Sequence, residues 1–308
     1  MKRQWLAIAA VFTVLLAGCS KPQTAWITDL QAAKDAAAKQ NKDLLIAFTG
    51  SDWNDQSKQL ITTVFTKDFF KKASKKYVLC NVDIVQDESL MDKATLEANY
   101  KSATAYGVQG LPTFVLATGE GDVYGNGAGN ETSNTLDEFF AYLDTFKDAR
   151  KKLVDLKKKV KSSKGAEKAK SIDAFIEAIQ PAQREQYSDM IRQVPDLDAD
   201  GKAGLKGKYQ LQVAYLDAVD LFQKEKLTEA GDCFKKLAEG DSLNPAQLQE
   251  AWYMAAYLYA MSGAMDNAKV IEWLEKAIAC DPENPGTQQI KNTIEQIKKN
   301  PPQAKPKQ

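Results

Sequence analysis

The distribution of β-strand patterns divides this chain of 308 residues into two unlike parts. Short apolar and β-branched runs occur only in the first part, at 44–49, 77–84, 114–117 and 123–124, with helical patterns between them. From about residue 164 onward, apolar residues recur only at helical spacing. The sequence therefore predicts an α/β domain followed by an all-α domain, and a length of this order also favours about two domains.

The absence of histidine excludes several classes of functional site. Catalysis by Ser-His-Asp or Cys-His groups needs an imidazole base, and many zinc, iron and copper sites need imidazole ligands. The 41 basic and 41 acidic side chains balance, whereas nucleic-acid-binding proteins usually carry a basic excess. We therefore expect a globular protein without a nucleic-acid partner.

The first residues have the pattern of an export signal. A short basic start precedes the apolar run Trp5–Leu16, which is too short to span a membrane. The tetrapeptide Leu-Ala-Gly-Cys that ends at Cys19 resembles the lipobox of bacterial lipoproteins. This resemblance implies cleavage after residue 18, acylation of Cys19 and anchoring in the lipid bilayer, since several acyl chains hold a protein stably. Ser20, in place of Asp, implies the outer membrane, so we expect a cell-envelope protein that faces the periplasm; the alternative is an ordinary signal peptide.

Separated motifs in the first part resemble those of thioredoxin-like proteins. Phe48–Trp53 looks like the strand end and tryptophan that introduce the family's redox motif, and Leu111–Phe114 resembles its cis-proline segment. The expected elements over 24–147 also follow the order of that fold: helix, strand, helix, strand, helix, strand, strand, helix. The resemblance implies a thioredoxin-like α/β domain at 25–148, with Pro112 as the cis residue.

The sequence departs from the family at the redox motif itself. Asn54 and Ser57 replace the two cysteines of C-x-x-C, and thiol–disulfide exchange needs a thiolate. Ala47 stands where redox-active relatives carry a buried acid. We therefore assign no catalytic residue and expect a redox-inactive domain that binds an envelope protein or peptide or acts as a scaffold. The alternative is a thiol–disulfide oxidoreductase relative with residual or partner-dependent activity.

The surface around the altered motif is a candidate peptide groove. Trp53, Asn54 and Ser57 would lie at a helix N-terminus, which has unpaired backbone N–H groups. The loop at Leu111 and Pro112 would offer main-chain groups to an extended peptide. The alternative is a scaffold that kept its fold after the site decayed.

Three thiols remain once Cys19 is acylated, and they are dispersed. Cys80 lies inside the second predicted strand, where a cysteine is usually a small buried residue. Cys233 and Cys280 both lie in the helical part, and an oxidising compartment would allow a disulfide. Pairing of these two residues stays an alternative to free thiols.

Two helix pairs in the second part resemble each other and the tetratricopeptide repeat. Small and large apolar residues recur in both pairs, namely Ala214, Ala218, Leu221, Ala230, Phe234 and Leu237 in the first and Trp252, Ala255, Ala256, Tyr259, Val270, Leu274 and Ala277 in the second. The offset of 38 residues from Leu211 to Gln249 is longer than the family's repeat of about 34. The resemblance implies a diverged helical repeat over 208–299 with a concave surface for a partner, and the alternative is a generic helical bundle.

An aspartate-rich stretch precedes this helical domain. Asp196, Asp198 and Asp200 have the spacing of the first ligands in an EF-hand loop, but Gly207 stands where a bidentate glutamate is needed. We expect a solvated turn, with calcium binding as the alternative and no other cofactor. The expected organisation is then a signal peptide at 1–18, a tether at 19–24, the α/β domain at 25–148, a helical connector at 149–207, the repeat-like domain at 208–299 and a disordered tail at 300–308.

Overall fold

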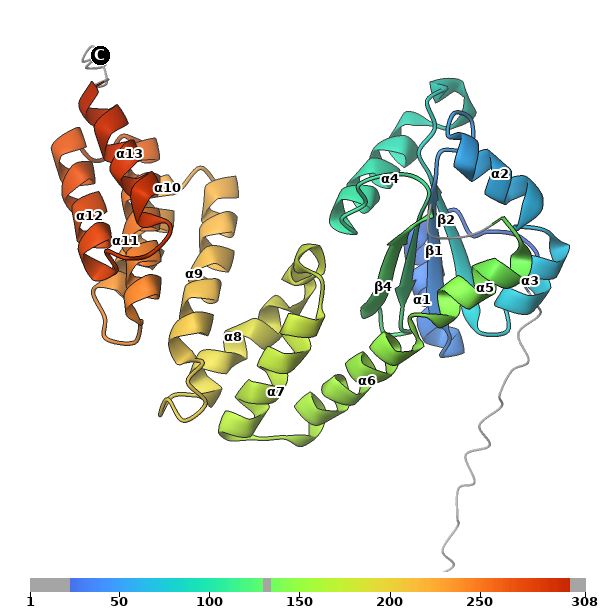
Figure 1. The fold of residues 1–308 in the computed structure, drawn as a ribbon, viewed down its shortest axis with the longest axis horizontal. Coiled ribbons are helices and arrows are strands. Elements are labelled where there is room, and N and C mark those ends of the chain that lie inside the picture. The colour runs from blue at the N-terminus through green and yellow to red at the C-terminus, as the bar shows by residue number, and fades with distance from the viewer. Residues whose placement is uncertain (1–22, 130–133, 300–308) are drawn as a thin grey trace, which may run out of the picture. The chain divides into compact units, whose positions relative to one another are not determined.

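The computed structural model describes residues 23–129 and 134–299, so the predicted signal peptide, Cys19 and the tail at 300–308 lie outside the described residues. The chain forms two compact units that divide near residue 143, one α/β and one helical (Figure 1). Two short segments of the first half, Lys101–Gln109 and Asp122–Gly125, group with the helical unit. The predicted order, an α/β domain followed by an all-α region, is confirmed.

A four-stranded sheet forms the centre of the α/β domain, with the strand order β2-β1-β3-β4. The strands are β1 (Asp43–Thr49), β2 (Tyr77–Asp83), β3 (Thr113–Ala117) and β4 (Val123–Ala128). Strand β1 runs parallel to β2 and antiparallel to β3. Every residue of β1 is buried, which explains why its sequence is continuously apolar rather than alternating.

Five helices accompany this sheet: α1 (Leu30–Gln40), α2 (Asp55–Thr63), α3 (Lys67–Ala73), α4 (Lys93–Ala105) and α5 (Leu136–Asp144). Aromatic rings form much of the core beside it. Phe65 lies 5.0 Å from Phe69 and 5.6 Å from Phe139, and Phe139 lies 4.9 Å from Phe114, measured between ring centroids. These edge-on and tilted contacts join α3 and α5 to β3.

Two predicted helices differ from the observed ones. The sequence pattern predicts a helix from Trp26 to Gln40. Helix α1 begins only at Leu30, because Ile27 pairs with Cys80 beside β2 and Trp26 packs on Phe65 at 5.1 Å. The Asp29 side chain caps α1 by accepting the N–H of Ala32. The sequence pattern also predicts a single helix from about 132 to 161. The structure divides the described part of this stretch into α5 and α6 (Lys147–Ser162).

The second unit contains α6 (Lys147–Ser162), α7 (Gly165–Ala178), α8 (Ser188–Leu197), α9 (Lys206–Gln223), α10 (Leu227–Ala238), α11 (Pro245–Ser262), α12 (Asn267–Cys280) and α13 (Thr287–Lys299). Each of these helices packs against the next one along the chain. Close approach depends on small residues: a Cβ at Gly231 would lie 2.6 Å from the ring of Tyr259. Within the described residues, no helix is long and apolar enough to cross a bilayer.

Candidate functional site

A tight turn joins β1 to α2 at the position of the family's redox motif. The backbone N–H groups of Trp53 and Asn54 both donate to the carbonyl of Gly50, at 3.3 and 2.8 Å. A Cβ at Gly50 would lie 2.7 Å from the Trp53 indole, so the turn needs glycine. The indole N–H of Trp53 donates to the Ile84 carbonyl at 2.7 Å. Trp53 is therefore held in one orientation while 37% of it stays exposed.

Asn54 is the N-cap of α2 and bonds in two directions. Its Oδ1 accepts the backbone N–H of Ser57 at 2.8 Å and the Ser57 hydroxyl at 2.9 Å. Its Nδ2 donates to the carbonyl of Leu111 at 3.2 Å, which joins the start of α2 to the proline loop. Ser57 is fully buried, and its Oγ accepts the N–H of Gly50 at 3.2 Å. Asn54 and Ser57 therefore serve as hydrogen-bond partners for each other inside the protein.

The structure corrects two features of the expected peptide groove. The N–H of Ser57 at the start of α2 is capped by Asn54 rather than open. The carbonyl of Leu111, which a peptide would use, already accepts from Asn54. The Leu111–Pro112 bond is cis, as the resemblance implies. The carbonyl of Pro112 also has a partner, the N–H of Gly129 at 2.6 Å, so fewer main-chain groups are open to a peptide here than the sequence suggests.

Comparisons with known proteins agree with this geometry. The chain matches a family described as a thioredoxin-like domain over residues 30–144. Residues 30–144 form a thioredoxin-like domain. Residues 205–303 match a second family, described as an uncharacterised protein C-terminal domain. The described part of this match, 205–299, lies in the helical region.

Two individual proteins show how far the similarity extends. An uncharacterized protein of Treponema pallidum (strain Nichols) is 28% identical over 282 residues, which cover 92% of this chain and 92% of that one. Among solved structures, a DsbH oxidoreductase is 22% identical and covers 41% of this chain and 84% of its own, with a TM-score of 0.36.

A polar cluster that sequence motifs missed supports the loop of the thioredoxin-like domain. The Asp83 carboxylate, at the end of β2, accepts the hydroxyl of Thr49 at 2.8 Å and the N–H of Ser51 at 2.9 Å, and it also bonds the Ser51 hydroxyl. Asp52 accepts two backbone N–H groups from the segment after β2, at 3.0 and 2.8 Å. Thr49 lies opposite Asp83 in the parallel register. In the sequence, the pattern that could have predicted this cluster is an acid at the end of one predicted strand and a threonine at the end of its parallel neighbour.

The thiols of the described residues are poorly suited to disulfide exchange. Cys80 is fully buried in β2, and burial raises its pKa to about 12, which confirms the expected core position. Cys233 and Cys280 are free thiols rather than a disulfide. Burial raises the pKa of both, and the carboxylates of Asp217 and Asp232 add to the effect at Cys233. A raised pKa lowers the thiolate fraction that attacks a disulfide.

The aspartates of the predicted calcium loop do not converge on one point. Asp196 is exposed in the last turn of α8, and Asp200 pairs with Lys202 at 2.7 Å. The carboxylate of Asp198 is fully buried and accepts three backbone N–H groups, those of Ala203 at 2.6 Å, Leu205 at 2.7 Å and Lys206 at 3.0 Å.

These contacts give the calcium alternative no support. In the part of the chain that the structure describes, no group of three or more acidic or thiol side chains could hold a metal ion. Asp198 instead orders the turn into α9. Burial alone would raise the pKa of its carboxyl, but the three N–H donors outweigh burial and the pKa is lowered.

Proposed function

We propose that this chain is a lipid-anchored protein of the bacterial envelope that binds a protein or peptide partner without exchanging disulfides. The observation that carries the proposal is the hydrogen bonding of Asn54. At the position of the family's attacking thiol stands an amide whose oxygen bonds Ser57 and whose nitrogen bonds the Leu111 carbonyl. An amide cannot attack a disulfide, and Ser57 is buried with its hydroxyl donated to Asn54.

The remaining thiols give the proposal further support. Cys80, Cys233 and Cys280 all have a raised pKa, and none lies in the loop after Trp53. The fold alone would also suit a thiol–disulfide oxidoreductase relative, in which one of these thiols would have to act. Envelope anchoring rests on the lipobox-like sequence that ends at Cys19.

Reduction of insulin by the purified protein tests the redox part of the proposal. We expect no turnover above the background of the added dithiol. The double variant Asn54→Cys/Ser57→Cys restores the C-x-x-C spacing on the same helix N-terminus and is the matched control that should gain activity. Turnover by the unaltered protein that disappears in Cys80→Ala, Cys233→Ala or Cys280→Ala would favour the oxidoreductase instead.

A further inference from the structure

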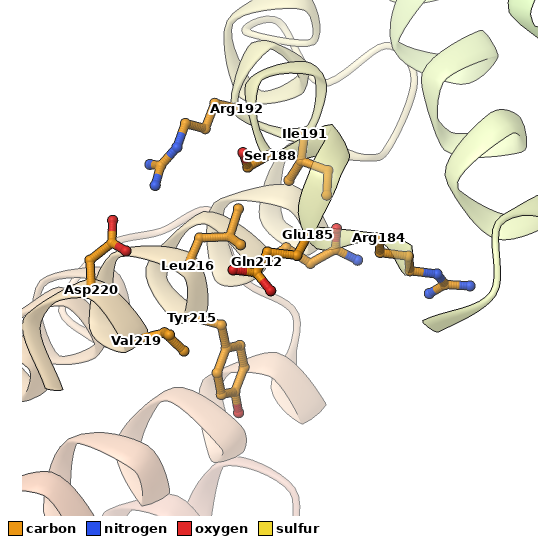
Figure 2. Close-up of a pocket in the computed structure, with 10 residues that line it drawn as sticks. All are labelled: Arg184, Glu185, Ser188, Ile191, Arg192, Gln212, Tyr215, Leu216, Val219 and Asp220. Atoms are coloured by element: carbon orange, nitrogen blue, oxygen red, sulfur yellow. The ribbon is translucent and has the colours of Figure 1, made fainter. Parts of the chain in front are cut away.

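The helical unit contains a hollow of about 360 Å³ between α8 and α9. Figure 2 shows Ser188, Ile191 and Arg192 on one side of it, with Leu216 and Asp220 opposite. Most of its exposed lining surface is apolar, and Ile191, Leu216 and Val219 contribute to it beside charged residues. Such a surface can receive an apolar side chain of a partner.

A second hollow is connected to the first by one hydrogen bond between their lining residues. Tyr215 lines the first hollow, and its hydroxyl donates to Glu250 of α11 at 2.7 Å. Glu250 and Tyr253 line the second hollow, also of about 360 Å³, which α11 forms with residues of α13 such as Ile290. We call the two hollows together the helical groove.

An exposed apolar strip overlaps the edge of the helical groove at Val219. Val219 and Phe222 of α9, and Tyr257 and Met261 of α11, are each 45–51% exposed. Helix α10 packs against both α9 and α11 through short connections, so α9 and α11 run in the same direction. The offset of 35 residues at the Tyr215–Glu250 bond then places Phe222 level with Tyr257. Exposed apolar residues gathered in this way are typical of an interaction surface.

The unpaired charges along the helical groove are acidic. Its two arginines are neutralised, Arg192 by Asp217 at 2.6 Å and Arg184 by Glu177 at 3.1 Å. Glu185 and Asp220 also line the first hollow, and no cationic side chain among the described residues pairs with them. Glu250 bonds a neutral hydroxyl. The groove therefore favours a cationic partner and repels nucleic acids and anionic lipid headgroups.

We propose that the helical groove binds a basic amphipathic segment of another protein. Apolar side chains of the segment would enter the two hollows, and its lysines or arginines would face Glu185, Asp220 and Glu250. Charge complementarity and the apolar strip select this partner. The inference rests on the binding role proposed above, but it does not depend on how the chain is anchored.

Fluorescence anisotropy with two labelled probe peptides tests the proposal. One is a short amphipathic helix of leucine and lysine, and the other carries glutamate in place of every lysine. With the full chain in a neutral detergent, we expect the lysine peptide to bind, the glutamate peptide not to bind, and added salt to weaken the binding. The double variant Glu185→Lys/Asp220→Lys should raise the Kd roughly tenfold.

A matched control separates the groove from overall charge. Asp68→Lys/Glu88→Lys adds the same charge at two exposed acids of the thioredoxin-like domain and should leave the Kd unchanged. Val219→Ser/Phe222→Ser removes exposed apolar area without opening the core, so it should weaken binding while the circular dichroism spectrum stays the same.

Four outcomes would overturn the proposal: no binding of the lysine peptide, equal binding of both peptides, equal loss in the two charge variants, or binding lost on Trp53→Ala but retained in the groove variants. None of these four outcomes bears on the redox proposal, because that proposal fails only if the protein reduces insulin. Loss of peptide binding with no insulin turnover leaves the redox proposal standing.

Discussion

Asn54 has a structural role at the start of α2. Its Oδ1 caps α2 at the N–H of Ser57, and its Nδ2 reaches the carbonyl of Leu111, 57 residues further along. A thiol at this position could not provide both bonds, because sulfur is a weak acceptor and carries a single weak donor. Asn54 therefore joins the start of α2 to the proline loop.

Removing both bonds is expected to destabilise the thioredoxin-like domain. Asn54→Ala deletes the cap and leaves the Leu111 carbonyl without this donor, so we expect a loss of about 1–2 kcal/mol in the free energy of unfolding, measured by urea denaturation. Thr66 is a fitting control because it stands at the N-cap of α3 without a side-chain cap bond. Thr66→Ala should cost clearly less, and an equal cost would contradict the role given to Asn54.

Thiol labelling is expected to separate the cysteines by burial. Cys80 is fully buried with a pKa of about 12, whereas Cys233 and Cys280 are half-buried. Maleimide treatment of the folded protein should modify Cys233 and Cys280 and leave Cys80 intact until denaturant is added, as read by mass spectrometry. Rapid labelling of Cys80 under native conditions would contradict its place in the core.

At the scale of elements, the turn from α8 into α9 depends on one buried carboxylate. Three N–H groups converge on Asp198, where the sequence spacing suggested a ligand for a cation. Backbone donors supply the positive partners that calcium would have supplied. Alternating acids and glycines in a sequence are thus compatible with a cation site or with an acid that accepts backbone N–H groups. In this loop the N–H groups at the start of α9 take the second course with Asp198.

The pKa of Asp198 predicts a dependence of stability on pH. Its folded pKa lies below the ordinary value of 3.8, so the unfolded chain binds the proton more tightly. The stabilisation is complete above that ordinary value and is lost as pH falls through the lower folded pKa. Asp198→Asn should lower the free energy of unfolding at neutral pH by about 2 kcal/mol and flatten its acid dependence.

Asp196→Asn is the control for that measurement, because Asp196 is exposed on α8 two residues away. Chemical denaturation as a function of pH should give the same curve for this variant and the unaltered protein. If Asp198→Asn keeps the full acid dependence, the carboxylate does not contribute as described.

The elements also show what the sequence could predict. The buried apolar run of β1 is a local pattern, and the sequence predicts it. The runs at 114–117 and 123–124, which become β3 and β4, are local patterns as well. The extended conformation at Ile27 is not a local pattern, because it depends on pairing with Cys80. The same holds at the candidate site: the replacement of cysteine by Asn54 is visible in the sequence, but its bond to Leu111 depends on the fold.

At the scale of the whole molecule, two units of different architecture share one chain. The thioredoxin-like domain keeps its family's cis-proline and tryptophan without its thiols. The helical groove lies entirely within the other unit. On our proposals, the helical unit binds the partner, and the thioredoxin-like domain is a stable fold on the same chain.

Membrane attachment is the prediction that involves the full chain. Acylation at Cys19 would hold the protein in the membrane fraction, and Cys19→Ser should release it to the soluble fraction of the envelope. Metabolic labelling with a fatty acid should mark the unaltered protein and not the variant. Labelling that persists in Cys19→Ser would exclude this residue as the anchor.

The closed network of Asn54, Ser57 and Leu111 has a consequence for the environments in which the protein can work. Amides and hydroxyls gain or lose no electrons at biological potentials, so the site is chemically the same in oxidising and reducing surroundings. Cys80 is shielded by burial, and the structure has no disulfide among its described cysteines. We therefore expect the thioredoxin-like domain to have the same stability in oxidising and in reducing compartments.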